Sequence, residues 1–122
     1  MDTGPPLGGV VHVRIGVRDL GRAAAFYEGL FGWQIVEVGS AEVVFRAPGG
    51  LRGVLWAAGE PSTTGPELYV RVASVDDALK RAASLGGARL VRPGPGPYGG
   101  RVAQVLDPEG NRVWLWEGGN VA

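Results

Sequence analysis

The sequence contains no cysteine, only one histidine and no excess of charge of either sign. Without cysteine, neither a disulfide framework nor a thiolate-ligated metal centre can form, and a reducing cytoplasm is the expected compartment. Lys and Arg together number 12, as do Asp and Glu, so the chain lacks the basic footprint of a nucleic-acid binder. No apolar run is long enough to span a membrane, and the opening "MDTGPPLGG" is unlike a signal peptide. We therefore expect a cytoplasmic protein that binds neither nucleic acid nor membrane.

What the chain does have is an internal repeat. Its 122 residues are enough for one domain with a hydrophobic core. Residues 12–36 align without a gap with residues 67–91 at an offset of 55, and residues 43–56 align with residues 103–116 at an offset of 60. Both alignments superimpose apolar and glycine positions, and the second also superimposes a tryptophan. The sequence therefore predicts two copies of one structural unit, with a longer connection in the second copy at 92–100.

Each unit reads as a strand, a helix and three further strands. In the first unit, apolar residues alternate over 11–17, and Asp19 is a typical N-cap for a helix over 22–30. In the second unit, Ser74 takes the N-cap position of a helix that runs through Leu85. Glycines end both helices. Three short β-rich runs follow each helix, at 33–38, 41–46 and 52–57, then at 88–92, 101–106 and 111–117.

The stretches "HVRIGVRDLGRAAAFYEGLFGW" and "GGRVAQVLDPEGNRVWLWE" resemble the vicinal oxygen chelate superfamily. That family includes glyoxalase I, extradiol dioxygenases, fosfomycin-modifying enzymes and bleomycin-resistance-type proteins. The resemblance covers residues 10–117 and implies an α+β fold, in which two βαβββ modules, here 10–57 and 67–117, form a curved mixed sheet around a concave cavity. We expect residues 1–9 to be a flexible leader and residues 118–122 to be a tail.

The resemblance also indicates where a metal site would lie in this chain. Metal-dependent members of the family draw ligands from the first and last strands of each module. Carried onto this chain, those positions fall on His12, Val54, Glu67 and Trp114. A catalytic divalent ion normally needs at least three protein ligands, and valine and tryptophan supply none. No metal cofactor is therefore predicted, and if a divalent metal is bound, His12 and Glu67 are its expected ligands.

Strand alternation indicates which side chains line the cavity. Successive residues of a strand face opposite sides of a sheet. In each unit, the face turned away from the helix therefore carries aromatic side chains and arginines. These predicted ligand-binding residues are Arg14, Trp56, Tyr69, Arg71, Arg112, Trp114 and Trp116. Flat aromatic walls with a few cationic groups suit a planar or amphipathic small molecule.

Several of these residues have a structural alternative. Trp56 and Trp116 could instead fill the cavity rim or a subunit interface. The arginines could be solvated charges, or could pair with Glu37, Glu42 or Glu67. The segment 92–100, "RPGPGPYGG", is expected beside the cavity mouth, where Tyr98 would reach a bound ligand; otherwise it is a plain connector.

The leading hypothesis is a metal-independent small-molecule-binding protein. It would sequester an aromatic or amphipathic compound in a tryptophan-lined cleft, as bleomycin-resistance proteins do, and would be a homodimer. One alternative is an enzyme, a lyase, isomerase or cyclase rather than glyoxalase I proper, in which the Glu67 carboxylate favours the protonated His12 ring and the two form an acid–base pair. Another is a metal-dependent glyoxalase- or dioxygenase-type enzyme that uses the same two residues as ligands. A structural ion pair is the remaining role for His12 and Glu67.

Overall fold

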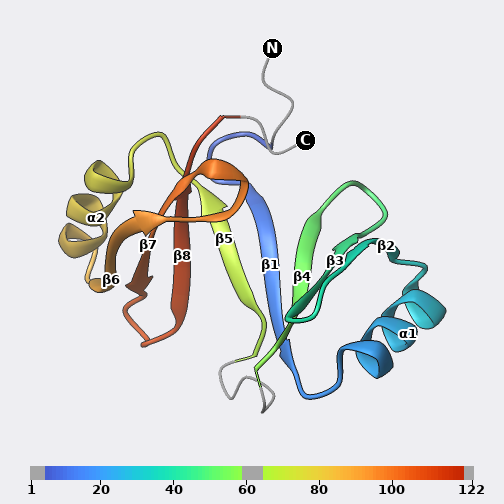
Figure 1. Ribbon diagram of the computed structural model, residues 1–122. Coiled ribbons are helices and arrows are strands. Elements are labelled where there is room, and N and C mark those ends of the chain that lie inside the picture. Colours follow the sequence, from blue (N-terminus) through green and yellow to red (C-terminus); the bar gives the residue numbers. More distant parts are fainter. Residues whose placement is uncertain (1–4, 59–64, 120–122) are drawn as a thin grey trace. The chain divides into compact units, whose positions relative to one another are not determined.

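The structure is a computed structural model that describes residues 5–58 and 65–119 (Figure 1). By its contacts the chain divides into two compact units. We call residues 12–67 the first unit, and residues 68–122 together with residues 1–11 the second unit. Along the chain, strand, helix and three strands occur twice, which confirms the predicted α+β class and its βαβββ modules. Neither α-helix in the described ranges is long and apolar enough to cross a membrane.

The first unit is a four-stranded mixed sheet with one helix (Figure 1). Its elements are β1 (Val10–Val17), α1 (Leu20–Phe31), β2 (Gln34–Val38), β3 (Glu42–Arg46) and β4 (Arg52–Ala57). The strands lie in the order β2-β3-β4-β1. The pair β1 and β4 is parallel, and the other two pairs are antiparallel. A parallel pair needs a crossover connection, and α1 begins that connection.

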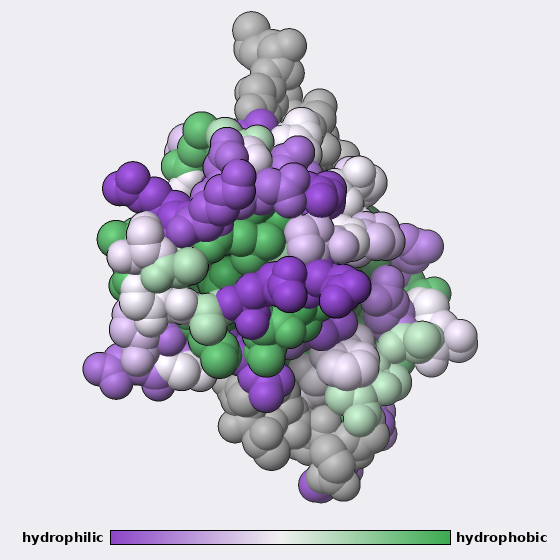
Figure 2. Space-filling view, turned by 90° about the vertical axis from the view of Figure 1, so that its left-hand side faces the viewer, coloured by the Kyte–Doolittle hydropathy of each residue, from purple (hydrophilic) through white to green (hydrophobic). Residues whose placement is uncertain are grey.

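The second unit repeats this plan with one addition. Its elements are β5 (Glu67–Arg71), α2 (Val75–Ser84), β6 (Ala88–Pro95), the 3₁₀ turn η1 (Pro97–Gly99), β7 (Arg101–Leu106) and β8 (Arg112–Glu117). The strands lie in the order β5-β8-β7-β6, with β5 and β8 parallel. α2 packs on β6, β7 and β8. Figure 2 views the side on which α2 and β6 lie in Figure 1, where hydrophobic atoms show between rows of hydrophilic side chains.

The strand register reproduces the internal repeat. In the first unit, Arg14 pairs with Val54 and Gly16 with Trp56. The sequence offsets of 55 and 60 carry these residues onto the pairs that β5 and β8 form, Tyr69 with Trp114 and Arg71 with Trp116. The two units therefore share not only their order of elements but also the pairing of their first and last strands.

The predicted helix starts are confirmed. The Asp19 carboxylate accepts a hydrogen bond from the backbone N–H of Arg22 at 3.0 Å, and the Ser74 hydroxyl accepts one from the N–H of Asp77 at 3.1 Å. Each bond satisfies a backbone donor that the first turn of a helix leaves unpaired. α1 ends at Gly32, whose φ of 71° lies in the left-handed region that glycine adopts without strain.

The core of the first unit forms between α1 and the sheet. Phe45 and Leu55 are fully buried there, and Ile15, Val17 and Tyr27 pack against them. Trp33 lies in a stack, 4.7 Å from the Tyr27 ring and 4.4 Å from the Phe45 ring. The alternation predicted for β1 and β4 is thereby confirmed for this unit, because Val17 and Leu55 face the helix.

The structure differs from the sequence-based expectation in two segments. Residues 5–9, expected as part of a flexible leader, are bonded to β5: Gly8 donates to the Arg71 carbonyl at 2.7 Å, and the Arg71 N–H donates to Gly9 at 2.9 Å. The backbone groups of Arg71 need partners, and the glycines supply them. Residues 92–95, expected in a connection, continue β6. Residues 1–4 of the leader and 120–122 of the tail lie outside the described residues.

Gly53 in β4 provides a test of this packing. A Cβ at Gly53 would press on the Val13 carbonyl oxygen and the Phe45 ring, whereas a Cβ at Gly29 in α1 would meet nothing within 4 Å. We expect Gly53→Ala to lower the free energy of unfolding by about 1–3 kcal/mol. Gly29→Ala should raise it by roughly 0.5–1 kcal/mol, since alanine favours the helix. Urea unfolding monitored by tryptophan fluorescence measures both, and a Gly53→Ala protein as stable as the parent would contradict the packing.

Candidate functional site

The face of the first unit's sheet opposite α1 carries most of its polar side chains. Since Ile15 and Leu55 pack toward α1, their neighbours along the strands point the other way. The residues on that face of β1 and β4 are His12, Arg14, Gly16, Arg52, Val54 and Trp56. Strand alternation therefore brings together the predicted residues His12, Arg14 and Trp56.

Arg14 holds two of its neighbours on this face. Its Nε–H donates to the Glu67 carboxylate at 2.6 Å, and its guanidinium carbon lies 4.6 Å from the centroid of the Trp56 ring. The pair is partly shielded from solvent, with side chains 31% and 16% exposed. A charge-assisted hydrogen bond and a cation–π contact together fix the orientation of the guanidinium. Of the roles considered for Arg14, the structure thus shows the pairing with Glu67.

His12 is buried and electrically neutral. It is only 5% exposed, and burial, helped by the positive charge of Arg14, lowers its pKa to about 4. The prediction that the Glu67 carboxylate would favour the protonated ring was wrong, because Glu67 is bonded to Arg14 and the loss of solvation dominates. At neutral pH the expected acid–base pair therefore lacks its protonated imidazole.

In the second unit, Tyr69 and Trp114 form an aromatic platform. Their rings are stacked at 5.4 Å with an interplanar angle of 5°. The Trp114 indole N–H is buried, and within residues 5–58 and 65–119 it has no hydrogen-bond partner. A buried donor without an acceptor costs about 1–3 kcal/mol, so this nitrogen is a natural point of attachment for a ligand oxygen. Gln104, which is 3% exposed, lies opposite Trp114 in the strand register.

Gln104 was not among the predicted site residues. The signal was present, because Gln104 is the one polar residue within the otherwise apolar run "VAQVL" of β7. A buried amide needs hydrogen-bonding partners, and a site that binds a polar organic molecule can supply them.

Trp116 and Tyr98 pack on each other. Trp116 is fully buried, and its indole N–H donates to the Pro97 carbonyl at 2.8 Å. The Tyr98 ring meets it edge-on at 6.3 Å, with the Tyr98 backbone in the left-handed region at φ 57°. In this arrangement the Trp116 ring belongs to a core cluster and offers no surface to a ligand.

The two remaining predicted arginines differ in their surroundings. Arg71 donates to the carbonyl of Pro5 at 2.8 Å and to that of Gly118 at 3.2 Å, so its guanidinium holds backbone. Arg112 is exposed at the start of β8, opposite Leu106.

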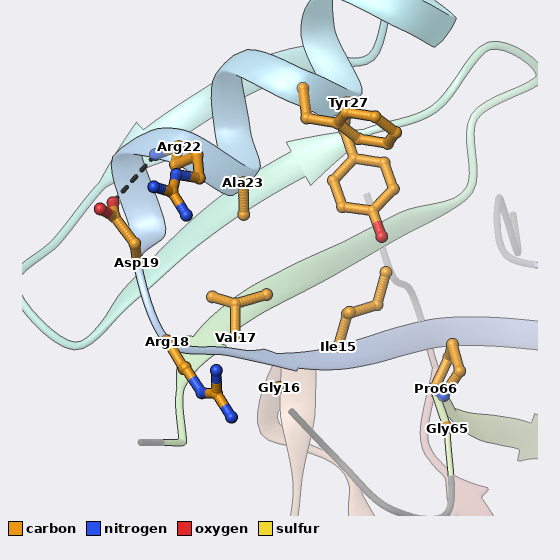
Figure 3. Close-up of a pocket in the computed structure, with 11 residues that line it drawn as sticks. Ile15, Gly16, Val17, Arg18, Asp19, Arg22, Ala23, Tyr27, Gly65 and Pro66 are labelled. Carbon is orange, nitrogen blue, oxygen red and sulfur yellow. Dashed lines mark hydrogen bonds between the residues drawn. The ribbon is translucent and has the colours of Figure 1, made fainter. Parts of the chain in front are cut away.

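A pocket that the sequence did not indicate lies on the α1 side of the first unit. It measures about 570 Å³ and opens between α1 and β1. In Figure 3, Val17 and Ile15 rise from β1 toward Ala23 and Tyr27 of the helix, with Asp19 and Arg22 at one end. Most of these apolar side chains also belong to the core, and the charged side chains at its edge, Arg18, Asp19 and Arg22, are exposed. The pocket is suited to an apolar group but offers few buried polar groups to select one.

The sequence profile of the Glyoxalase/Bleomycin resistance protein/Dioxygenase superfamily matches residues 9–115. The chain belongs to this superfamily. Its resemblance to the vicinal oxygen chelate proteins is therefore confirmed. No curated protein matches the sequence.

Solved structures of other superfamily members have the same fold. Methylmalonyl-CoA epimerase from Mycobacterium tuberculosis matches with a TM-score of 0.67 and 22% identity, over 96% of this chain and 91% of that one. The Mn(II)-bound glyoxalase from Novosphingobium aromaticivorans matches with a TM-score of 0.69 and 22% identity, over 91% of this chain and 39% of that one. At these identities the likeness shows the fold alone.

The donor set does not fit the metal that some members of the superfamily bind. A neutral His12 imidazole is a suitable ligand, but Glu67 is already bonded to Arg14, and Val54 at the third position is buried hydrocarbon. In the described part of the chain, no three His, Cys, Asp or Glu side chains gather where they could hold an ion. Two candidate ligands, one of them engaged, are too few for a catalytic site.

The ionisation of His12 can be tested directly. Since it is the only histidine, its ring resonances identify it in an NMR titration, and we expect a midpoint of about 4 in the folded protein. The unfolded chain binds the proton more tightly, with a pKa near 6.5, so the free energy of unfolding should fall as the pH drops from about 6.5 to 4. The total loss would be roughly 3 kcal/mol. His12→Gln should remove this dependence, and a folded-state midpoint above 6.5 would contradict the neutral, buried ring.

Proposed function

We propose that the protein is a metal-independent small-molecule-binding member of the superfamily, which sequesters an aromatic or amphipathic organic compound. The observation that carries the proposal is the buried Trp114 N–H without an acceptor, beside the stacked ring of Tyr69. An aromatic wall with one unsatisfied donor is the usual composition of a ligand site, since apolar contact supplies affinity and the polar group fixes orientation. Gln104, opposite Trp114, adds an amide to the same row of side chains.

The ligand this site favours has a flat apolar part and a hydrogen-bond acceptor. A ring or conjugated chain would lie against the Tyr69–Trp114 platform, and an ether, carbonyl or acid oxygen would accept from the Trp114 nitrogen. Such an acceptor would satisfy a donor that the chain alone leaves unpaired, so ligands with the oxygen should bind better than isosteres without it.

An enzyme is the second candidate, because a neutral imidazole can accept a proton from a substrate. His12 is such a group, and methylmalonyl-CoA epimerase is among the proteins of similar fold. Against this role, a base with a pKa of about 4 is weak at neutral pH, and Glu67 is held by Arg14 rather than by His12. The two candidates separate with His12→Ala, which should leave binding by a sequestering protein within a few-fold but abolish turnover by an enzyme.

The binding proposal predicts a loss of ligand affinity when the Trp114 N–H is removed. With the aromatic sulfonate 1-anilinonaphthalene-8-sulfonate as probe, Trp114→Phe should weaken binding about 3–10-fold, the value of one hydrogen bond, while Trp114→Ala should weaken it further by removing the platform. Probe fluorescence measures both. Leu85→Ala is the control, since Leu85 is an exposed apolar residue, 64% exposed, at the end of α2. Equal losses in Leu85→Ala and Trp114→Phe would mean that the dye adheres to apolar surface, and would contradict the site.

We further propose that the protein is a homodimer that uses the exposed face of α1. Phe26, Leu30 and Phe31 are 55%, 60% and 52% exposed, and no residue of α1 is buried. Large apolar side chains gathered on one helix favour association with another surface, and a second copy of the chain is the simplest partner.

The dimer proposal predicts that a charge on α1 will dissociate it. Phe31→Glu should shift the protein from dimer to monomer in sedimentation velocity, because a buried carboxylate without a partner opposes association. Leu85→Glu is the control, since Leu85 is similarly exposed, at 64%, but follows α2. A monomeric parent protein, or equal effects of both substitutions, would reject the α1 interface.

A further inference from the structure

Four side chains with N–H groups form a row across the first unit's sheet. In the strand register Gln34 lies opposite Arg46, Arg46 opposite Arg52, and Arg52 beside His12. Ile35 and Phe45, the chain neighbours of Gln34 and Arg46, pack in the core next to α1. Because side chains alternate along a strand, the row lies on the face opposite α1.

Two positive charges in this row face each other without compensation. Arg46 and Arg52 are directly opposed in an antiparallel pair, where like charges are destabilising. Neither forms an ion pair or hydrogen bond through its side chain within residues 5–58 and 65–119, and the Arg52 Nε is buried without a partner.

The carboxylates on the same face do not neutralise the pair. Glu67 is bonded to Arg14, Glu42 lies opposite Trp56, and Glu37 lies opposite Val44. By contrast, the cationic residues expected to meet a ligand are largely engaged, since Arg14 binds Glu67 and Arg71 binds two backbone carbonyls. Within residues 5–58 and 65–119, the guanidinium groups of Arg46 and Arg52 therefore remain available to an anion on this face of the first unit.

We propose that the row formed by Gln34, Arg46, Arg52 and His12, the anion row, binds the phosphate or carboxylate group of a small organic ligand. This inference goes beyond the proposed function, because the row lies in the first unit whereas Tyr69 and Trp114 belong to the second. Guanidinium groups match the oxygens of phosphate and carboxylate in pairs, and an anion between two of them removes their repulsion. Because the row carries two positive charges, a phosphate monoester dianion should bind more tightly than a carboxylate.

The rest of the face indicates the shape of the ligand. The next pair of residues along β3 and β4 is Val44 with Val54, and the pair after that is Glu42 with Trp56. Each step of two strand residues spans about 6.6–6.8 Å, so the backbone of Trp56 lies about 13 Å along β4 from that of Arg52. A ligand with an acidic head, an apolar middle and an aromatic or cationic far end would match the sequence of arginines, valines and tryptophan.

The test uses phenyl phosphate and phenylacetate as probes at constant ionic strength. Binding is measured by calorimetry and by NMR, following the arginine Nε–H cross-peaks. Arg52→Gln and Arg46→Gln should each weaken the binding of phenyl phosphate about tenfold, the effect of losing one charge-assisted contact. Arg89→Gln is the matched control, because Arg89 is an exposed arginine on β6 and the substitution changes the net charge equally. It should leave binding within about twofold.

The outcomes separate the anion row from the proposed function. If Arg46→Gln and Arg52→Gln weaken the binding of either probe and Arg89→Gln does not, the row is supported. The probe that binds more tightly to the parent protein then identifies the head group as phosphate or carboxylate. No binding to the parent protein, or an equal loss in Arg89→Gln, overturns the row. If the row is overturned but Trp114→Phe still weakens the binding of the naphthalenesulfonate probe, the proposed function stands without the anion row. Thermal unfolding of the glutamine variants shows whether each is folded, and removing one of two opposed charges should not lower their stability.

Discussion

The pairing of the first strand of each unit with its last strand is the constraint on which the rest of the structure depends. β1 lies parallel to β4, and β5 lies parallel to β8, in equivalent register. A parallel pair cannot be joined by a tight turn, so the chain must leave, form a helix and return through two more strands. The same pairing decides what faces the helix. Once Val17 and Leu55 are fixed on the α1 side, Arg14 and Trp56 can only point the other way.

Much of this organisation could be predicted from the sequence, because it depends on local patterns. The caps at Asp19 and Ser74 are set by a side chain and a backbone N–H three residues on, and both were found where the sequence indicated. The division into two units follows from self-similarity at a fixed offset. The family resemblance, confirmed by the profile match to residues 9–115, was also visible in two short stretches of sequence.

The chemistry of the polar face could not be predicted in the same way, because it depends on which charged groups meet across strands. Strand alternation leaves several partners open for Arg14, including Glu37, Glu42 and Glu67, and does not decide among them. The bond that forms, to Glu67, removes this carboxylate from His12. The pKa of His12 follows from the depth of burial, which no local pattern encodes. The hydrogen bonds of Gly8 and Gly9 were likewise not predicted, since they are made to the backbone of Arg71, far along the chain.

Arg71 ties both ends of the described chain to the second unit. Its side chain binds the carbonyls of Pro5 and Gly118, and its backbone binds Gly8 and Gly9. One residue therefore anchors segments from both ends of the described chain. Its counterpart in the repeat is Gly16, which has no side chain to do the same in the first unit. The second unit therefore has a tie against fraying that the first unit lacks. Shortening the Arg71 side chain would release the segments at Pro5 and Gly118 together. A protease would then gain access to both segments at the same time.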